Sequence, residues 1–79
     1  MTPHLTNAEY INDYRIKVKF EDGTEGVINM ENELWGEVFE PLKDISQFQD
    51  FVFDRELRTI VWPSTGADLA PEFIYEQAV

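Results

Sequence analysis

An unbroken alternation of apolar and polar residues runs from Tyr14 to Phe20. Strict alternation with β-branched and aromatic residues is typical of a strand that buries one face. The face expected to be buried carries the residues Tyr14, Ile16, Val18 and Phe20. The face expected in solvent carries the basic residues Arg15, Lys17 and Lys19.

The dipeptide Asp22-Gly23 follows this strand and predicts a tight turn, because glycine tolerates a positive φ. The chain then returns as a second strand over residues 24–30. Gly26 within that strand indicates a bulge or a close approach of another backbone. We also expect Glu25 to lie across from one of the basic residues, in a cross-strand pair that contributes about 0.2–1 kcal/mol.

A further strand is predicted ahead of this hairpin, over residues 5–11, with a turn at Asn12-Asp13. Consecutive strands that are joined by tight turns pair as antiparallel neighbours. The N-terminal half is therefore expected to form a three-stranded antiparallel meander.

From residue 31 to residue 50 apolar residues recur near helical spacing, but Gly36 and Pro41 interrupt the pattern. Proline inside a helix removes a hydrogen bond and clashes with the preceding turn, so one continuous helix is excluded. We therefore expect a short helical or irregular connection that covers one face of the sheet. Asp44 or Ser46 is the expected N-cap of a helical turn in this connection.

The C-terminal part predicts a two-stranded hairpin followed by a helix. Residues 51–53 and 59–62 are short apolar runs that are separated by a polar turn. Pro63 ends the second run because it has no N–H for a strand ladder. Pro71 suits the first position of a helix that extends to about Gln77, since its missing N–H has no helical partner there. The predicted fold class is α+β, with an antiparallel sheet and a single domain.

Length and composition agree with this outline. The chain has 79 residues, enough for one domain, and a hydrophobic content of 43%, enough for one core. It has no cysteine, which excludes disulfides and thiolate metal sites. No apolar run approaches the about 18 residues of a membrane span, and the N-terminus lacks the pattern of a signal peptide. We expect a cytoplasmic protein that has no membrane partner.

The charge balance is strongly acidic, with sixteen acids, six bases and a formal net charge of −10. Proteins bind nucleic acids by neutralising phosphates with Lys and Arg, so binding by the isolated chain is disfavoured. The basic row of the first predicted strand is more simply the solvated face of an antiparallel sheet. An acidic chain suits a basic partner protein and also imitates nucleic acid. The alternative explanation is that the charge only maintains solubility.

Residues that would support catalysis or hold a cofactor are scarce. His4 is the only histidine, and Ser46 and Ser64 are the only serines. The sequence has no Gly-x-Ser-x-Gly elbow, no calcium-binding loop of the EF-hand type and no glycine-rich phosphate loop. We therefore expect no catalytic residues, no metal site and no cofactor, and a protein that is not an enzyme.

The segment Trp62–Tyr75 has the most distinctive side chains of the chain. Gly66 is expected to adopt a positive φ in a tight loop, and a cis peptide bond before Pro63 is the minority alternative. Asp68 is expected to accept hydrogen bonds from N–H groups of this loop. One interpretation is a structural corner between the last strand and the helix. The other is an acidic and aromatic interaction surface made of Trp62, Asp68, Glu72 and Tyr75.

This segment resembles the ending of the bacterial domain-of-unknown-function family 2442, which has the form Trp-x-x-Gly-Ala-Asp-Leu-x-Pro-Glu-x-Leu-Tyr. The matching residues are Trp62, Gly66, Ala67, Asp68, Leu69, Pro71, Glu72, Ile74 and Tyr75. One extra residue precedes Gly66, and Ile74 stands in place of leucine. The family's Phe-x-Asp-Gly element is matched by Phe20, Asp22 and Gly23, and its Phe-x-Pro-Leu element by Phe39, Pro41 and Leu42.

The resemblance implies a small α+β fold of three strands, a helical connection, two strands and a helix. It also implies that the domain occurs alone, joined to a helix-turn-helix domain, or beside a second small protein in a toxin–antitoxin-like pair. It transfers no catalytic residue.

The function that we expect is a non-enzymatic protein-interaction module, the antitoxin-like partner of a small basic protein. One alternative is a regulatory or DNA-associated module that acts through a partner or a homodimer. Another is a small-ligand or metal-dependent enzyme. A homodimer is also favoured because the edges of a five-stranded sheet need to be covered.

Overall fold

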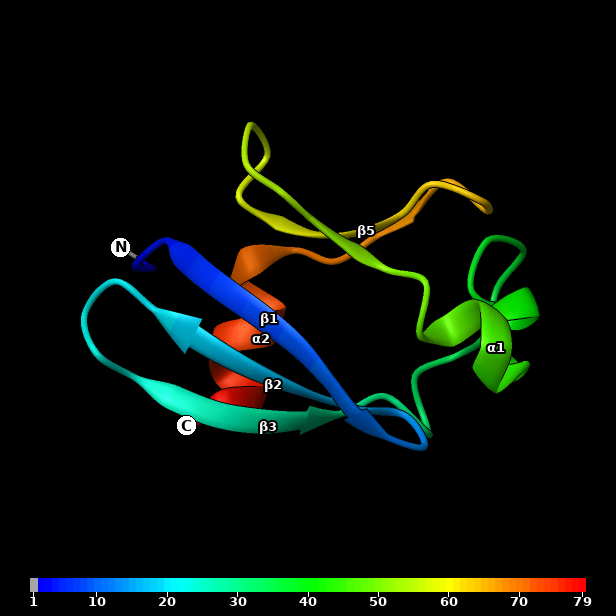
Figure 1. The fold of residues 1–79 in the computed structure, drawn as a ribbon, viewed down its shortest axis with the longest axis horizontal. Coiled ribbons are helices and arrows are strands. Elements are labelled where there is room, and N and C mark those ends of the chain that lie inside the picture. Colours follow the sequence, from blue (N-terminus) through cyan, green and yellow to red (C-terminus); the bar gives the residue numbers. More distant parts are fainter. Residues whose placement is uncertain (1) are drawn as a thin grey trace.

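In the computed structural model, which describes residues 2–79, two antiparallel sheets, a short helical connection and a C-terminal helix surround one core (Figure 1). The first sheet has the order β1-β2-β3, with β1 Leu5–Asn12, β2 Arg15–Phe20 and β3 Glu25–Asn29. The second has the order β4-β5-β6, with β4 Val52–Asp54, β5 Thr59–Trp62 and β6 Ala67–Asp68. The helical elements are η1 Glu40–Lys43, α1 Ile45–Phe48 and α2 Pro71–Ala78. The predicted α+β class is confirmed.

The first sheet is the predicted meander, and β2 lies at its centre. Ile16, Val18 and Phe20 are fully buried on its inner face. On the outer face Lys19 lies directly opposite Glu25, and the Nζ atom of Lys17 lies 4.0 Å from the Glu25 carboxylate. The predicted cross-strand pair is therefore confirmed.

The second sheet contains one strand more than the predicted hairpin. β4 and β5 pair as expected, with Val52 opposite Val61. β6 then pairs with the other edge of β5, with Ala67 opposite Trp62. A strand of two residues shows no alternation, so the sequence pattern did not indicate it. The six strands form two three-stranded sheets, and not the one five-stranded sheet that we expected.

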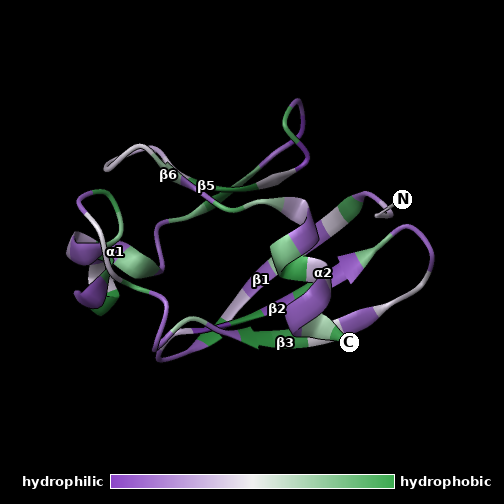
Figure 2. Ribbon diagram, turned by 180° about the vertical axis from the view of Figure 1, so that it is seen from behind, coloured by the Kyte–Doolittle hydropathy of each residue, from purple (hydrophilic) through white to green (hydrophobic). Residues whose placement is uncertain are grey.

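Helix α2 covers the inner face of the first sheet, behind the sheet in Figure 1 and in front of it in Figure 2. It begins at Pro71, as predicted, and its last turn packs against β3. A Cβ atom on Gly26 would overlap the carbonyl oxygen of Ala78 and would lie 2.9 Å from its Cα. The close backbone approach that was predicted at Gly26 is thus confirmed.

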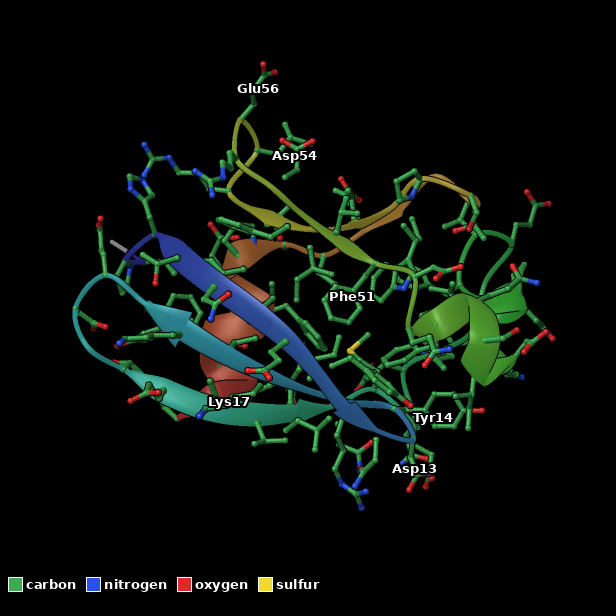
Figure 3. All side chains as sticks on the ribbon, in the orientation of Figure 1. Asp13, Tyr14, Lys17, Phe51, Asp54 and Glu56 are labelled. Atoms are coloured by element: carbon green, nitrogen blue, oxygen red, sulfur yellow. The ribbon has the colours of Figure 1, made fainter. Side chains whose placement is uncertain are left out.

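An aromatic cluster joins the two sheets through the connection. The ring of Phe48 lies 5.3 Å from Tyr14 and 5.6 Å from Trp62, measured between centroids. The rings of Phe39 and Phe51 contact Trp62 at 6.2 and 6.1 Å. Figure 3 shows Phe51 directed toward the space between the sheets and Tyr14 beside α1. Aromatic pairs with these spacings and tilted rings are favourable beyond the area that they bury.

The connection itself is short and broken, as predicted. Pro41 lies in the first turn of η1, and the fully buried Leu42 anchors this element to the core. Asp44 separates η1 from α1 and is the N-cap of α1, since its carboxylate accepts the N–H of Ser46 at 3.0 Å. The choice between Asp44 and Ser46 as the cap is therefore settled in favour of Asp44.

Candidate functional site

Trp62 is a core residue and does not belong to the molecular surface. Its side chain is fully buried, and the indole N–H donates a hydrogen bond of 2.7 Å to the carbonyl oxygen of Phe48. The interaction surface that we considered from the sequence therefore loses its largest member. For Trp62 the structural interpretation of the segment is the correct one.

Tyr75 also has a structural position. It is half-buried on α2, its ring lies 4.9 Å from that of Phe20, and its hydroxyl donates to the Asp22 carboxylate at 3.1 Å. The N–H and the side chain of Thr24, and then Tyr75, hold the pKa of Asp22 below its ordinary value by hydrogen bonding. Tyr75 thus fastens α2 to the turn between β2 and β3.

Asp68 and Glu72 are both exposed, but they face different hollows of the surface. We had expected the Asp68 carboxylate to hold the loop before it by accepting hydrogen bonds. Instead, Oγ1 of Thr65 accepts the N–H of Ala67, at 3.2 Å. Gly66 has the predicted positive φ of 80°, and no peptide bond of the described chain is cis. The structure therefore does not gather the four predicted residues into one surface.

Asp68 belongs to a different constellation, an open hollow of about 280 Å³ that we call the aromatic pocket. Its apolar walls come from the loop after β3, the segment between β6 and α2, and α2 itself. They consist of Met30, Trp35, Phe39, Leu69, Ala70 and Phe73. The acidic residues Glu33 and Asp68 complete the lining.

The loop after β3 sends neighbouring side chains in opposite directions. Leu34 is fully buried in the core, whereas 72% of the Trp35 side chain is exposed. Gly36 has a φ of 93°, a conformation that L side chains disfavour, and its carbonyl accepts the N–H of Phe39 and of Glu40. This reversal returns the chain so that Phe39 lies on Trp62 and faces the same hollow as Trp35.

The opposite wall is fixed by the end of the second sheet. The N–H of Leu69 donates to the carbonyl of Ile60 at 3.1 Å, and the buried hydroxyl of Thr59 donates to the carbonyl of Leu69. Ala67 and Leu69 are buried, so the strand alternation leaves Asp68 outside. Phe73 follows in the first turn of α2 and is half-buried.

The electrostatic environment of the pocket is negative. Residues 31–40 include four glutamates and neither lysine nor arginine. Among residues 2–79, no side-chain hydrogen bond or ion pair engages Glu33 or Asp68. Aromatic faces attract cations, and carboxylates do so more strongly, so the pocket is suited to a positively charged group.

Sequence reasoning missed Trp35 and Phe73 as members of a site. The usable signal was the position of Trp35, a large aromatic residue beside a glycine and within a glutamate-rich run. Phe73 has no comparable signal, because its role depends on where α2 lies against the loop after β3.

Residues 2–79 lack two other features. No helix there is long and apolar enough to cross a bilayer. No group of three or more His, Asp or Glu side chains there is placed to hold a metal ion. His4 lies at the N-terminal end, where its ring nitrogen is 3.0 Å from Arg58 and 3.5 Å from Glu21.

Comparison with known families decides the affiliation of the chain. The model of the family "Protein of unknown function (DUF2442)" matches residues 5–79. The chain belongs to this family. No curated protein and no solved structure matches this chain. In this DUF2442 domain the Phe-x-Asp-Gly element and the final Tyr75 contact each other through Phe20 and Asp22, so both serve the fold.

Proposed function

We propose that this DUF2442 domain is a non-enzymatic interaction module that binds a small basic protein, as the antitoxin-like member of a pair. The observation that carries the proposal is the aromatic pocket, an open apolar hollow that is also lined by Glu33 and Asp68, on a chain of net charge −10. Among residues 2–79, neither of these two carboxylates has an ion-pair partner. Interfaces are enriched in aromatic anchors, and complementary charge selects the partner and accelerates association.

The distribution of ion pairs supports a basic partner. Among residues 2–79, Lys and Arg form ion pairs only with Asp13, Glu25 and Glu40 of the sixteen acids, and Glu21 lies beside His4. These pairs are exposed, and exposed pairs contribute little to stability. Most of the negative charge is therefore available to a partner.

The outer row of basic residues supports a protein partner over DNA. Arg15 lies 3.3 Å from the Asp13 carboxylate, and Lys17 lies 4.0 Å from that of Glu25. Glu9 also lies opposite Lys17 in the register of β1 and β2. Carboxylates inside the row reduce its attraction for phosphates.

The surroundings of Ser46 and His4 support a non-enzymatic role. A serine nucleophile needs a base within hydrogen-bond reach. The hydroxyl of Ser46 instead donates to the Asp44 carboxylate at 2.8 Å, as part of a helix cap. His4 faces Arg58 and Glu21.

Copurification tests the proposal. The chain is co-expressed with the product of each neighbouring gene and captured at low and at high ionic strength, with an unrelated basic protein of equal size and charge as the control. We expect one basic neighbour to copurify and its retention to decrease as salt screens the charges. If no neighbouring product copurifies at any ionic strength, or if the control is retained equally, the proposal is wrong.

A further inference from the structure

The exposure of Trp35 is the first observation that points to an occupant of the aromatic pocket. The fold does not need this side chain, because the adjacent Leu34 already anchors the loop in the core. Phe39 and Phe73 face the same hollow and are only partly covered. Tryptophan is one of the residues that are enriched among the anchors of protein interfaces.

The size of the pocket limits the occupant. Pockets for small-molecule ligands measure roughly 300–1,000 Å³ and enclose most of the ligand. This hollow of about 280 Å³ lies at the lower limit of that range and is open to solvent. It is matched to one long side chain that is presented by another protein.

The carboxylates limit its chemistry. An apolar side chain would remove water from Glu33 and Asp68 without replacing their hydrogen bonds, which is costly for charged groups. An acidic side chain would be repelled. A lysine or arginine side chain suits both the apolar walls and the acidic residues of the pocket. Its alkyl stem packs on apolar surface, while its charge meets aromatic faces and carboxylates.

We infer that the aromatic pocket receives a single Lys or Arg side chain of the basic partner, with Trp35 and Phe73 along its stem and Glu33 and Asp68 at its charge. This inference rests on the proposed function, since it names the group through which the partner binds. A second copy of this chain is a poorer occupant, because two molecules of charge −10 repel each other.

A peptide titration tests the inference without the partner. Blocked peptides of the form Gly-Ser-X-Ser-Gly, in which X is lysine, arginine, norleucine or glutamate, are added to the ¹⁵N-labelled chain. Norleucine keeps most of the lysine stem but lacks the ammonium group. We expect the lysine and arginine peptides to shift the indole N–H resonance of Trp35 and the amide resonances of Asp68 and Phe73. The resonance of the buried Trp62 indole should remain in place.

Variants locate the binding. W35A and the double variant E33Q/D68N should each weaken the binding of the lysine peptide about tenfold or more. L57A is the matched control, because Leu57 is 59% exposed and lies on the turn between β4 and β5, outside the pocket. It should bind as the wild type does.

The outcomes separate the inference from the proposed function. Equal binding of norleucine and lysine, shifts that avoid the pocket, or no shift with either cationic peptide would overturn the inference. A neighbouring protein that copurifies equally with wild type and W35A would leave the proposed function intact and refute the pocket as its anchor. Binding of the lysine peptide in the pocket, with no neighbour that copurifies, would retain the pocket and reject the proposed partner.

Discussion

At the scale of single residues, the two tryptophans of the chain lie in opposite environments. Trp62 is fully buried and donates its N–H to a backbone carbonyl, whereas most of Trp35 is in water. The composition of the chain does not distinguish the two tryptophans, but their neighbouring residues in the sequence do. Trp62 ends an apolar strand, and Trp35 precedes Gly36 in an acidic loop. We therefore assign Trp62 to the stability of the fold and propose Trp35 for binding.

This contrast predicts different costs for the same substitution. W62F removes the hydrogen bond to the Phe48 carbonyl and leaves a cavity, so it should lower the free energy of unfolding by about 2–4 kcal/mol. W35F is the matched control and should change it by less than about 0.5 kcal/mol. Urea unfolding of both variants measures the difference. Equal losses would show that the loop after β3 depends on Trp35 for its folding.

Gly26 gives a second prediction at the residue scale. G26A places a Cβ atom against the backbone of Ala78, and backbone cannot rotate away as a side chain can. We expect a loss of about 1–3 kcal/mol in urea unfolding, as for other overpacked sites. V27T, on the neighbouring exposed position, should have little effect. A neutral G26A would mean that the last turn of α2 does not pack on β3.

At the scale of elements, the strands with clear alternation were predictable from the sequence. The β2 strand needs its period of two because one face is buried and the other is solvated. The two-residue β6 was not predictable, since its pairing with β5 depends on the loop that Gly66 allows. The same limit explains why the aromatic pocket was not predicted from the sequence. Asp68 was selected, but the aromatic pocket combines three separate segments, and local sequence does not show which of them meet.

Asp22, in the turn after β2 that contacts α2, predicts a pH dependence of the free energy of unfolding. Hydrogen bonds from Thr24, and then from Tyr75, lower the folded pKa of Asp22. Its contribution to stability is therefore fully present above its unfolded pKa of about 3.9 and is lost as pH falls through the lower folded value. D22N lacks this contribution. Acid titrations of unfolding free energy should therefore show the gap between wild type and D22N closing below about pH 4. The difference in unfolding free energy between Y75F and D22N should be smaller than that between wild type and D22N. If the difference between wild type and D22N stays constant on acidification, this account of Asp22 is wrong.

At the scale of the whole molecule, the uncompensated charge is the dominant property. A net charge of −10 on 79 residues opposes the compact state through self-repulsion. Screening by salt should therefore raise the Tm of the isolated chain between low and moderate NaCl concentrations. A matched series with a neutral osmolyte separates screening from preferential exclusion. A Tm that falls with NaCl would indicate that the few surface ion pairs outweigh the repulsion. The homodimer that we expected from open sheet edges stays a prediction.

We propose that the same charge serves binding where it lies beside the exposed Trp35. The most direct measurement is the affinity of the copurified basic partner for wild type, W35A, E33Q/D68N and E9Q/E76Q. The two double variants remove equal charge, but only the first removes it from the pocket. We predict that W35A and E33Q/D68N bind at least about tenfold more weakly, while E9Q/E76Q changes affinity by much less. Unchanged affinity of W35A, together with equal losses in both double variants, would show that net charge alone binds the partner.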